Sequence, residues 1–403
     1  MGKPDIRFKG YTDEWEQRKL GELYQRNTER NENLIGYDKT ISVATMSYKD
    51  DGNGASESSL STYKVIRVGD IAFEGHTNKQ FRFGRFVVND IGTGIMSPRF
   101  STLRPLNEMP VNFWKQYIHS ESVMRRILVN STKAGTMMNE LVIPEFLNQT
   151  IMVPSENEQA IIGQYFTNLD HLITLHQRKC DEVKSLKKYM LQKMFPQNEQ
   201  KVPEIRFEGF TEAWEQRKLS DIYDSIGNAF VGTATPYYAE QGHFYLESNN
   251  VKDGQINHNS EIFINDEFYE KQKDKWLHTG DMVMVQSGHV GHAAVIPEEL
   301  DNTAAHALIM FRNPKEEIEP YFLNYEYQTD KAKKKIENIT TGNTIKHILA
   351  SDMQEFVVDV PNYEEQKVIA SYFRNIDHLI TLHQQKCEEL KKIKKFMLQK
   401  MFV

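Results

Sequence analysis

The chain has 403 residues, of which 39% are hydrophobic and 26% charged, so it is long enough for more than one globular domain. No apolar run approaches the length of a membrane span, the first residues MGKPDIRFKG lack an apolar signal region, and two cysteines make no disulfide framework, so we expect a cytoplasmic protein. The 49 basic and 56 acidic side chains give a net charge of −7, which taken alone argues mildly against a nucleic-acid partner, although the distribution of charge over the faces matters more than its sum.

A short segment at the start of the chain, which we call the arm, is repeated in the middle of the chain. Pro4–Leu20 (PDIRFKGYTDEWEQRKL) returns as Pro203–Leu219 (PEIRFEGFTEAWEQRKL). A tryptophan repeated inside a matching apolar frame is more often a packing anchor than a binding site, and we expect this of Trp15 and Trp214. The repeat predicts a chain of two similar halves.

The regions that follow the two arms differ in detail but share a frame. Each has a Gly-Asp pair that opens an apolar strand, a second strand, a helix, a Gly-Thr type loop and a final strand, which together predict a compact α+β domain. The regions are residues 21–152 and 220–359, the Gly-Asp pairs are Gly69-Asp70 and Gly280-Asp281, and the expected helices are Pro110 to Val129 and Pro320 to Ile336.

The first region carries a basic stretch with interleaved aromatic residues. In KQFRFGRF the cations and the phenylalanines alternate, as on a strand that packs with one face and meets DNA with the other, although a solvated strand face gives the same pattern. Nearby histidine and amide side chains could pair with base edges. The candidate DNA-binding residues here are His76, Asn78, Lys79, Gln80, Arg82, Arg85 and Arg99.

The second region offers polar side chains in place of a basic strand. We take Asn249, Asn250 and Lys252 in one loop, and Gln286, Ser287, His289 and His292 in QSGHVGH, as candidate DNA-binding residues, with the glycines allowing a close approach of the backbone. A catalytic pair of histidines is the alternative for His289 and His292, but no carboxylate or cysteine is close in sequence. The lysines at 331 and 333–335 either contact phosphates or cover a solvated helix face.

The Gly-Thr type loops could hold a phosphate with their backbone amides. Their candidate DNA-binding residues are Thr136 in the first region and Asn343, Thr344 and Lys346 in the second.

A long repeated segment ends each half. Val153–Phe195 and Val360–Phe402 agree at roughly two-thirds of positions, and apolar or small residues recur in steps of four and three, as in a heptad seam. Each predicts a helix of about 38 residues, on the order of 55 to 60 Å long, whose most economical partner is the other copy. The polar segment QNEQK between Pro196 and Pro203 predicts a linker.

Two side chains of each helix could form another kind of site. His176 and Cys180, with His383 and Cys387, are spaced for a zinc site between two helices, or for a semi-polar layer that fixes the register of the seam. The exposed lysines Lys187, Lys188, Lys394 and Lys395 either dock partners or form a solvated stripe.

Signatures of catalysis are missing. The one Gly-Lys pair precedes proline, which excludes a phosphate-binding Walker loop, and there is no HExxH, nucleophile elbow, or Asp-Pro-Pro-Tyr or Asn-Pro-Pro-Phe tetrapeptide of an amino-methyltransferase. We expect no catalytic centre and no metal or cofactor bound by this chain.

These motifs occur twice in the same order. In this the chain resembles, over essentially its whole length, the specificity (S) subunit of type I restriction-modification systems. The quoted motifs are Trp-Glu-Gln-Arg-Lys-Leu, a variable region with Gly-Asp, the Gly-Thr loop, Val-Pro with Glu-Gln, and a helix ending Leu-Gln-Lys-Met-Phe. The resemblance implies an α+β protein with two target-recognition domains separated by an antiparallel coiled coil of two long helices, an internal pseudo-twofold duplication. Its expected segments are an arm (1–20), target-recognition domain 1 (21–152), a central helix and linker (153–202), target-recognition domain 2 with its arm (203–359) and a C-terminal helix (360–403).

The resemblance also implies partners. Each domain would recognise one half of a bipartite, asymmetric site in double-stranded DNA. Two methyltransferase (M) subunits would supply S-adenosylmethionine and adenine methylation, and restriction (R) subunits would supply ATP-dependent, magnesium-dependent cleavage. The rival hypothesis is a coiled-coil scaffold whose end domains bind protein or carbohydrate, for which binding would be insensitive to salt.

Overall fold

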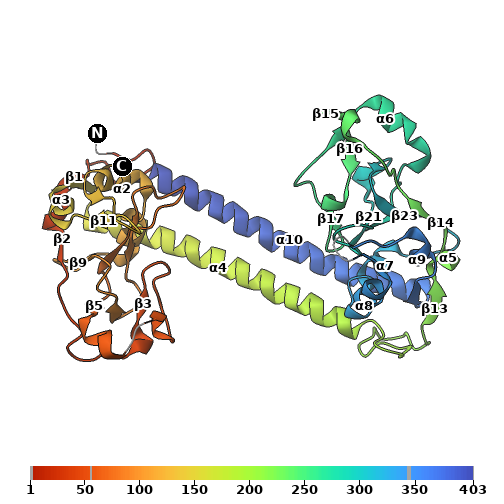
Figure 1. Cartoon of the computed structure of the whole chain (residues 1–403), viewed down its shortest axis with the longest axis horizontal. Coiled ribbons are helices and arrows are strands. Elements are labelled where there is room, and N and C mark those ends of the chain that lie inside the picture. The colour runs from red at the N-terminus through yellow and green to blue at the C-terminus, as the bar shows by residue number, and fades with distance from the viewer. Residues whose placement is uncertain (1–2, 55–56, 343–345, 403) are drawn as a thin grey trace. The chain divides into compact units, whose positions relative to one another are not determined.

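The computed structural model describes residues 3–54, 57–342 and 346–402, and they divide into two compact units. The first unit is Met1–Gln177 together with Gln384–Val403, and the second is Arg178–His383. Each unit therefore contains parts of both long helices, α4 (Glu156–Lys193) and α10 (Tyr363–Lys400) (Figure 1). No helix in the described ranges combines the length and the apolar character needed to cross a membrane.

A four-stranded antiparallel sheet lies at the centre of the first unit. Its strand order is β2 (Tyr24–Arg26), β9 (Thr102–Pro105), β6 (Ile71–Glu74) and β7 (Arg85–Val88). All four residues of β6 are buried, because the sheet is covered on both faces. Ile71 and Phe73 join the larger core, and Ala72 joins a second cluster on the other face.

The second unit repeats this sheet with the same strand order. Its strands are β14 (Tyr223–Asn228), β23 (Leu308–Pro314), β20 (Met282–Val285) and β21 (Ala293–Val295). Met282 and Met284 pack into one core, and Val283 and Val285 pack into another on the opposite face. The shared frame expected of the two regions is thus confirmed, down to the register of the central strands.

Smaller strands and helices complete the units. In the first they are β3 (Ile41–Ser42), β4 (Ser47–Tyr48), β5 (Lys64–Ile66), β8 (Gly94–Met96), β10 (Thr132–Lys133), β11 (Glu140–Leu141) and α3 (Ile143–Asn148). In the second they are α5 (Leu219–Ile222), β15 (Tyr238–Ala239), β16 (His243–Leu246), β17 (Val251–Lys252), β18 (Gln255–Ile256), β19 (Phe263–Ile264), α6 (Asp266–Lys271), β22 (Ala304–Ala305) and α9 (Ala350–Gln354).

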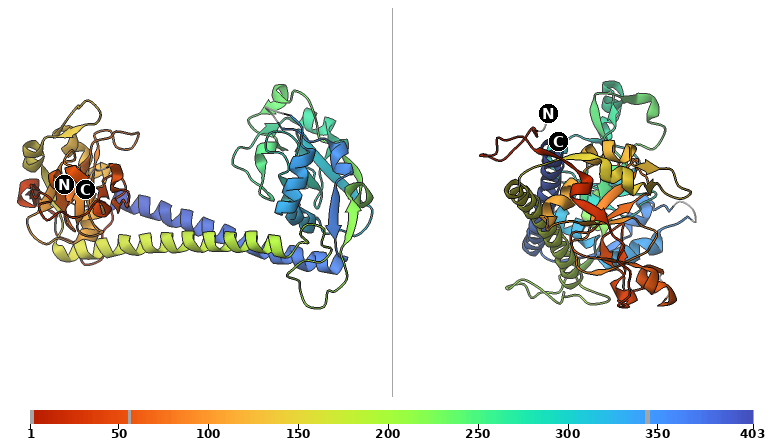
Figure 2. Two further views of the ribbon diagram at one scale, coloured as in Figure 1. Left: turned by 60° about the horizontal axis from the view of Figure 1, so that its bottom comes forward. Right: turned by 90° about the vertical axis from the view of Figure 1, so that its left-hand side faces the viewer.

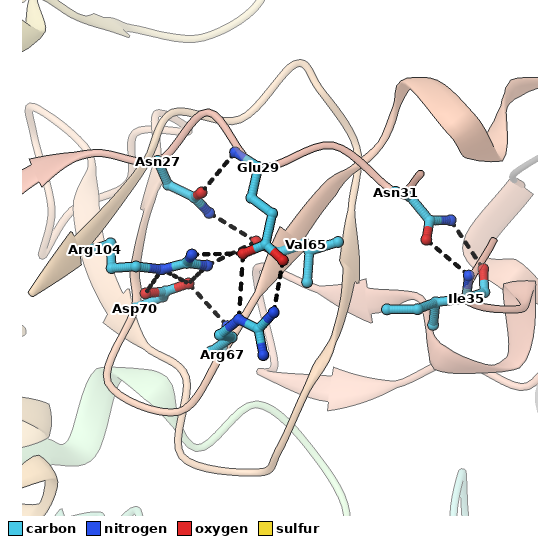
Figure 3. Close-up of polar contacts among 8 residues, drawn as sticks. All are labelled: Asn27, Glu29, Asn31, Ile35, Val65, Arg67, Asp70 and Arg104. Atoms are coloured by element: carbon cyan, nitrogen blue, oxygen red, sulfur yellow. Dashed lines mark hydrogen bonds and ion pairs between the residues drawn. The ribbon is translucent and has the colours of Figure 1, made fainter. Parts of the chain in front are cut away.

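The Gly-Asp pairs form turns that lead into the central strands. Asp70 is 2% exposed, accepts the Arg67 backbone N–H at 2.8 Å and forms an ion pair with Arg104 at 2.8 Å (Figure 3). Arg104 and Arg67 also bind Glu29, and their hydrogen bonds hold the pKa of that carboxyl below its ordinary value. The equivalent Asp281 accepts the His278 N–H at 2.8 Å. The motif is therefore structural, and Arg104 is committed to the core.

Each region carries two short helices where the sequence predicted one. In the first unit they are α1 (Val111–Tyr117) and α2 (Glu121–Val129), and in the second α7 (Pro320–Glu326) and α8 (Asp330–Ile339). The prediction of a single continuous helix was wrong because a polar turn precedes each second helix. Thr329 caps α8 by accepting the Ala332 N–H at 3.2 Å, and Ser120 holds the same position before α2.

The long helices pair within each unit. In the first unit Phe166 and Leu169 of α4 share a core with Leu390 of α10 and with Met401 directly after it, and Asp170 pairs with Lys394 at 2.6 Å. In the second unit Val183 and Met190 of α4 pack with Phe373 and Ile376 of α10, and Lys187 pairs with Asp377 at 2.7 Å. In both units, residue numbers increase along one helix in the direction in which they decrease along the other, so the two helices are antiparallel (Figure 2).

Each arm joins the end of a long helix. Strand β1 (Glu16–Lys19) pairs with β12 (Thr150–Val153), and β13 (Glu215–Lys218) pairs with β24 (Val357–Val360). Ahead of them, Ile6 N–H donates to Lys400 O at 2.9 Å, and Ile205 N–H donates to Lys193 O at 2.9 Å. Trp15 and Trp214 are 3% and 2% exposed, as expected of packing anchors.

The phenylalanine just after each long helix packs into the core next to the repeated arm. Phe402 contacts Phe113, Tyr117 and Phe166 in the first unit. Phe195 contacts Trp214, Phe322 and Phe373 in the second.

Candidate nucleic-acid interface

In each sheet a hairpin connects one central strand to the edge strand beside it, β6 to β7 in the first unit and β20 to β21 in the second. In the first unit it joins Glu74 of β6 to Arg85 of β7, and in the second it joins Val285 of β20 to His292, just before β21. Because the strand registers match, Arg85 and His292 occupy equivalent positions. A two-stranded ribbon of this kind fits the major groove of DNA.

The Gly-Thr type loop lies against the hairpin in both units. Asn139 N–H donates to Gly75 O at 2.9 Å, and a Cβ on Gly75 would lie 1.9 Å from Asn139 O, so only glycine allows this approach. In the second unit Gly288 N–H donates to Lys346 O at 3.1 Å, and Ser287 bridges His347. The structure therefore brings together the hairpins and loops that the sequence singled out separately.

A helix in each unit, α2 in the first and α8 in the second, places cations near the hairpin. In the first unit burial raises the pKa of Glu121 at the start of α2, and Arg125 of α2 and Arg82 of the hairpin act against that shift, so both arginines lie within electrostatic reach of Glu121. In the second unit Lys333 of α8 acts on His292. The sequence missed Arg125, because helix α2 had not been separated from α1 and its exposed side had no assigned neighbour.

His292 is held by its surroundings in the neutral state. Its Nδ1 accepts the backbone N–H of Asp253 at 3.2 Å. Burial lowers the pKa of His292, and the neighbouring His289, Lys252 and Lys333 lower it too, against the opposing effect of Asp253.

The family of the chain follows from comparison with known proteins. Residues 12–185 and 211–392 each match the model of the type I restriction modification DNA specificity domain. The chain belongs to this family. It is 24% identical over 310 residues to the type I restriction enzyme MjaVIII specificity subunit of Methanocaldococcus jannaschii, covering 75% of this chain and 72% of the relative. It is 23% identical over 412 residues, covering 95% and 91%, to a chain of that organism assigned as the MjaX specificity subunit.

Solved structures share the fold. The type I restriction-modification S subunit from M. genitalium gives a TM-score of 0.61 at 13% identity, over 100% of this chain and 99% of that one. A chain from a structure that concerns complex assembly and conformational transition of the type I R-M system gives 0.56 at 18% identity, over 96% and 97%. The chain is a non-catalytic DNA-recognition subunit, and the rival scaffold for protein or carbohydrate ligands finds no support.

Within the first specificity domain, the predicted residues divide into exposed and engaged ones. Arg85 donates to Glu74 at 2.6 Å and to Ala44 O, so it is an ordered cation at the hairpin base. Asn78 accepts the Gln80 and Phe81 N–H groups and thereby shapes the turn. His76 lies 3.2 Å from Glu74, and Arg99 lies beside Met137. The exposed candidates are His76, Asn78, Lys79, Gln80, Arg82, Arg99 and Thr136.

Within the second specificity domain, one predicted residue is structural. Asn250 is 1% exposed, and its amide bonds Glu247, Asn257 and Ser260 within its own loop, so it cannot reach a DNA base. Gly291 packs against Ile336 of α8, so its close approach is internal. Asn343 and Thr344 lie outside the described residues. The candidates at the surface are Asn249, Lys252, Gln286, Ser287, His289, His292 and Lys346.

The lysines of α8 serve different purposes. Lys331 bonds Asp359 and Pro196 O, and Lys335 bonds Val357 O, so both hold the helix to the domain. Lys333 and Lys334 are exposed. Similarly, Lys187 and Lys394 form ion pairs inside the helix pair, so the interpretation of these two as an exposed docking or solvated stripe was wrong.

The zinc arrangement is not formed by the histidines and cysteines of the long helices. Across residues 3–54, 57–342 and 346–402, no three or more His, Cys, Asp or Glu side chains are placed to hold a metal ion. Cys387 instead lies 3.9 Å from Ile173 O within the helix pair, and both cysteines are buried.

Proposed function

We propose that each specificity domain recognises one half of a bipartite, asymmetric site in double-stranded DNA. The contacts would come from its hairpin (β6–β7 or β20–β21), the adjoining Gly-Thr type loop and the helix α2 or α8. The observation that carries this proposal is that one frame occurs twice with different side chains at equivalent positions. Arg85 and His292 take the same strand-end position, yet the first is a paired cation and the second a neutral ring. Two copies of one frame with unlike side chains suit two unlike half-sites.

The candidate residues of the hairpins and Gly loops are then the DNA-binding residues, with cations on the flanking helices contacting phosphates. The proposal assigns Lys79, Arg82, Arg99 and Arg125 to the first half-site and Lys252, Lys333 and Lys346 to the second. Local gathering of cations supports binding despite the net charge of −7, because Debye screening limits the reach of distant acidic side chains.

The long helices act as the spacer in this proposal. An antiparallel coiled coil of α4 and α10 would fix the separation of two target-recognition domains, 21–152 and 203–359, and hence the length of DNA between half-sites. The remaining segments 1–20, 153–202 and 360–403, which carry the repeated arm and the two repeated helices, would form the common scaffold. The heptad seam and the ion pairs within the helix pair support a rigid spacer.

The chemistry would come from partners in the cytoplasm. Two methyltransferase subunits would carry S-adenosylmethionine and methylate an adenine in each half-site, and restriction subunits would carry ATP and magnesium for cleavage. This chain would contribute recognition and bind none of these cofactors.

The test is to co-express the chain with its methyltransferase subunit and map methylated adenines across the genome. The expected result is one bipartite motif with a constant gap and two unlike halves. A continuous motif, or methylation without sequence preference, would contradict the proposal.

A further inference from the structure

The position shared by Arg85 and His292 is the strongest candidate for a residue that determines base specificity. It lies at the base of the hairpin, where the strand leaves the sheet and the side chain is neither in the core nor at a flexible tip. The His292 side chain is 33% exposed, so part of the ring faces outward.

The contacts of His292 fix which ring nitrogen carries the proton. Asp253 donates its backbone N–H to Nδ1 at 3.2 Å, so Nδ1 must present its lone pair and Nε2 must carry the hydrogen in the neutral ring. The carboxylate of Asp253 is 3.9 Å from Nδ1, too far for a hydrogen bond that would reverse this assignment. Among the described residues, no group accepts the Nε2–H.

The groups around His292 favour a base contact at this point. The ring centroid of His289 lies 6.4 Å from that of His292, and Lys252 and Lys333 are close enough to lower the pKa of His292, so two cations that can contact phosphates lie near the ring. A neutral donor beside two lysines adds little to phosphate binding, but it can distinguish base edges.

We propose that His292 determines one base pair of the half-site recognised by the second specificity domain, by donating its Nε2–H to a major-groove acceptor such as purine N7, guanine O6 or thymine O4. This inference rests on the proposed function and adds to it a residue, an atom and a class of base edge. Cytosine, which presents a donor at that edge, is disfavoured at the position.

Two substitutions separate the outward contact from the structural one. An asparagine places a polar atom where Nδ1 lies and can accept the Asp253 N–H, but it does not reach the Nε2 position. A glutamine reaches the Nε2 position with an amide donor. His292→Asn in the complex with the methyltransferase subunit is expected to relax one base pair of the second half-site by roughly 10- to 100-fold, while His292→Gln keeps the preference. His278→Asn, at the opposite end of β20 beside Asp301, is the matched control and should leave the motif unchanged.

A second measurement uses the unmodified protein. Target DNA is prepared with analogues that each lack one major-groove acceptor of the second half-site, for example 7-deazapurines. One such deletion should weaken wild-type binding, and the same deletion should have no further effect on the His292→Asn complex.

The outcomes distinguish this inference from the function beneath it. A motif that stays intact in His292→Asn, a loss of affinity that is uniform across sequences, or additive effects at every analogue would overturn the role of His292. The bipartite motif of the wild-type complex would still stand. Absence of any bipartite motif in wild type would instead overturn the proposed function.

Discussion

Glu326 is a buried acid that distinguishes the second specificity domain from the first. It lies on α7, accepts the Asp359 N–H at 2.9 Å through Oε1, and its Oε2 has no hydrogen-bond partner in the described part of the chain. Burial raises its pKa to about 8, even though Lys335 and Lys331 act in the opposite direction. The carboxyl is therefore protonated in the folded protein at neutral pH.

This raised pKa predicts a stability that falls with rising pH. The folded state holds a proton that the unfolded state releases near the ordinary value of 4.5, so the contribution is complete below that pH and lost as the pH passes about 8. Glu326→Gln should remove this dependence and stabilise the second unit by about 3 to 5 kcal/mol at pH 8.5 relative to wild type. Thermal unfolding from pH 5 to 9 measures it, with exposed Glu267→Gln as the control. Identical pH profiles for wild type and Glu326→Gln would contradict a protonated Glu326.

Arg82 and Arg125 provide a prediction about phosphate contacts. Replacing either by alanine should weaken binding about equally for specific and non-specific duplexes, and should lower the slope of log affinity against log salt concentration by about 1. A filter-binding or anisotropy titration at several salt concentrations measures this in the assembled complex. Arg104→Ala is not a suitable control, because Arg104 holds Asp70. If Arg125→Ala changed the methylated motif instead, the arginine would contact a base.

Sequence reasoning located the polar segments of the candidate interface better than it located the contacts of their side chains. The alternation in KQFRFGRF predicted a strand, but this was wrong for most of the stretch, because β7 begins only at Arg85 and residues 79–84 form the turn before it. The glycines of QSGHVGH correctly marked a segment with special backbone geometry, because turn composition is a local signal. The burial of Asn250, the pairing of Arg85 with Glu74 and the approach of Arg82 to Glu121 of α2 depend on contacts between separate segments. Local patterns do not encode such contacts, and this is why these three roles could not be predicted.

At the scale of elements, the helix pair offers a natural comparison between two equivalent ion pairs. Lys187 and Asp377 are 12% and 14% exposed, and Asp377 also accepts the Tyr325 hydroxyl at 2.8 Å. Lys394 and Asp170 are 22% and 42% exposed. Water screens the second pair more than the first, so the two should differ in strength despite their shared origin.

Double-mutant cycles test this difference. With Lys187→Met and Asp377→Asn, the coupling free energy should be about 1 to 3 kcal/mol, and with Lys394→Met and Asp170→Asn about 0.5 kcal/mol. Chemical denaturation of the full chain measures both. Equal coupling energies would show that solvent exposure does not control these pairs.

The contact between the first hairpin and its Gly loop gives another prediction at this scale. Gly75→Ala places a methyl group 1.9 Å from Asn139 O, so the loop must move away from the hairpin. We expect relaxed recognition of the first half-site only, together with a loss of about 1 to 3 kcal/mol in unfolding free energy. Gly227→Ala, where no atom lies within 4 Å of the added methyl, is the control for glycine replacement. An unchanged first half-site would remove the Gly loop from the interface.

At the scale of the whole molecule, the duplication made most of the architecture predictable. The repeated arms and helices gave the two halves, and the helices end within two residues of their expected limits. The split of each shorter helix was missed, because the turns before α2 and α8 contain neither glycine nor proline, and only Thr329 before α8 makes a side-chain capping bond. Two copies of a motif constrain a fold more than either copy does.

The duplication also predicts the result of exchanging regions. A chain whose residues 220–359 are replaced by a second copy of 21–152 should recognise the same half-site twice. If the two frames face opposite ways, as antiparallel helices require, the methylated motif becomes an inverted repeat. Methylome mapping of the exchanged chain measures it. A direct repeat would contradict the antiparallel spacer, and an unchanged motif would contradict recognition by the variable regions.

The placement of Phe402 in the core of the first unit has a consequence for biosynthesis. Residues 178–383 separate the body of that unit from the helix end that closes it. A ribosome therefore completes the second unit, including Phe195, before Phe402 is available to cover the aromatic residues of the first unit. The unit translated first therefore stays incompletely packed until the last segment has been translated. During that interval its apolar aromatic side chains are exposed and accessible to chaperones.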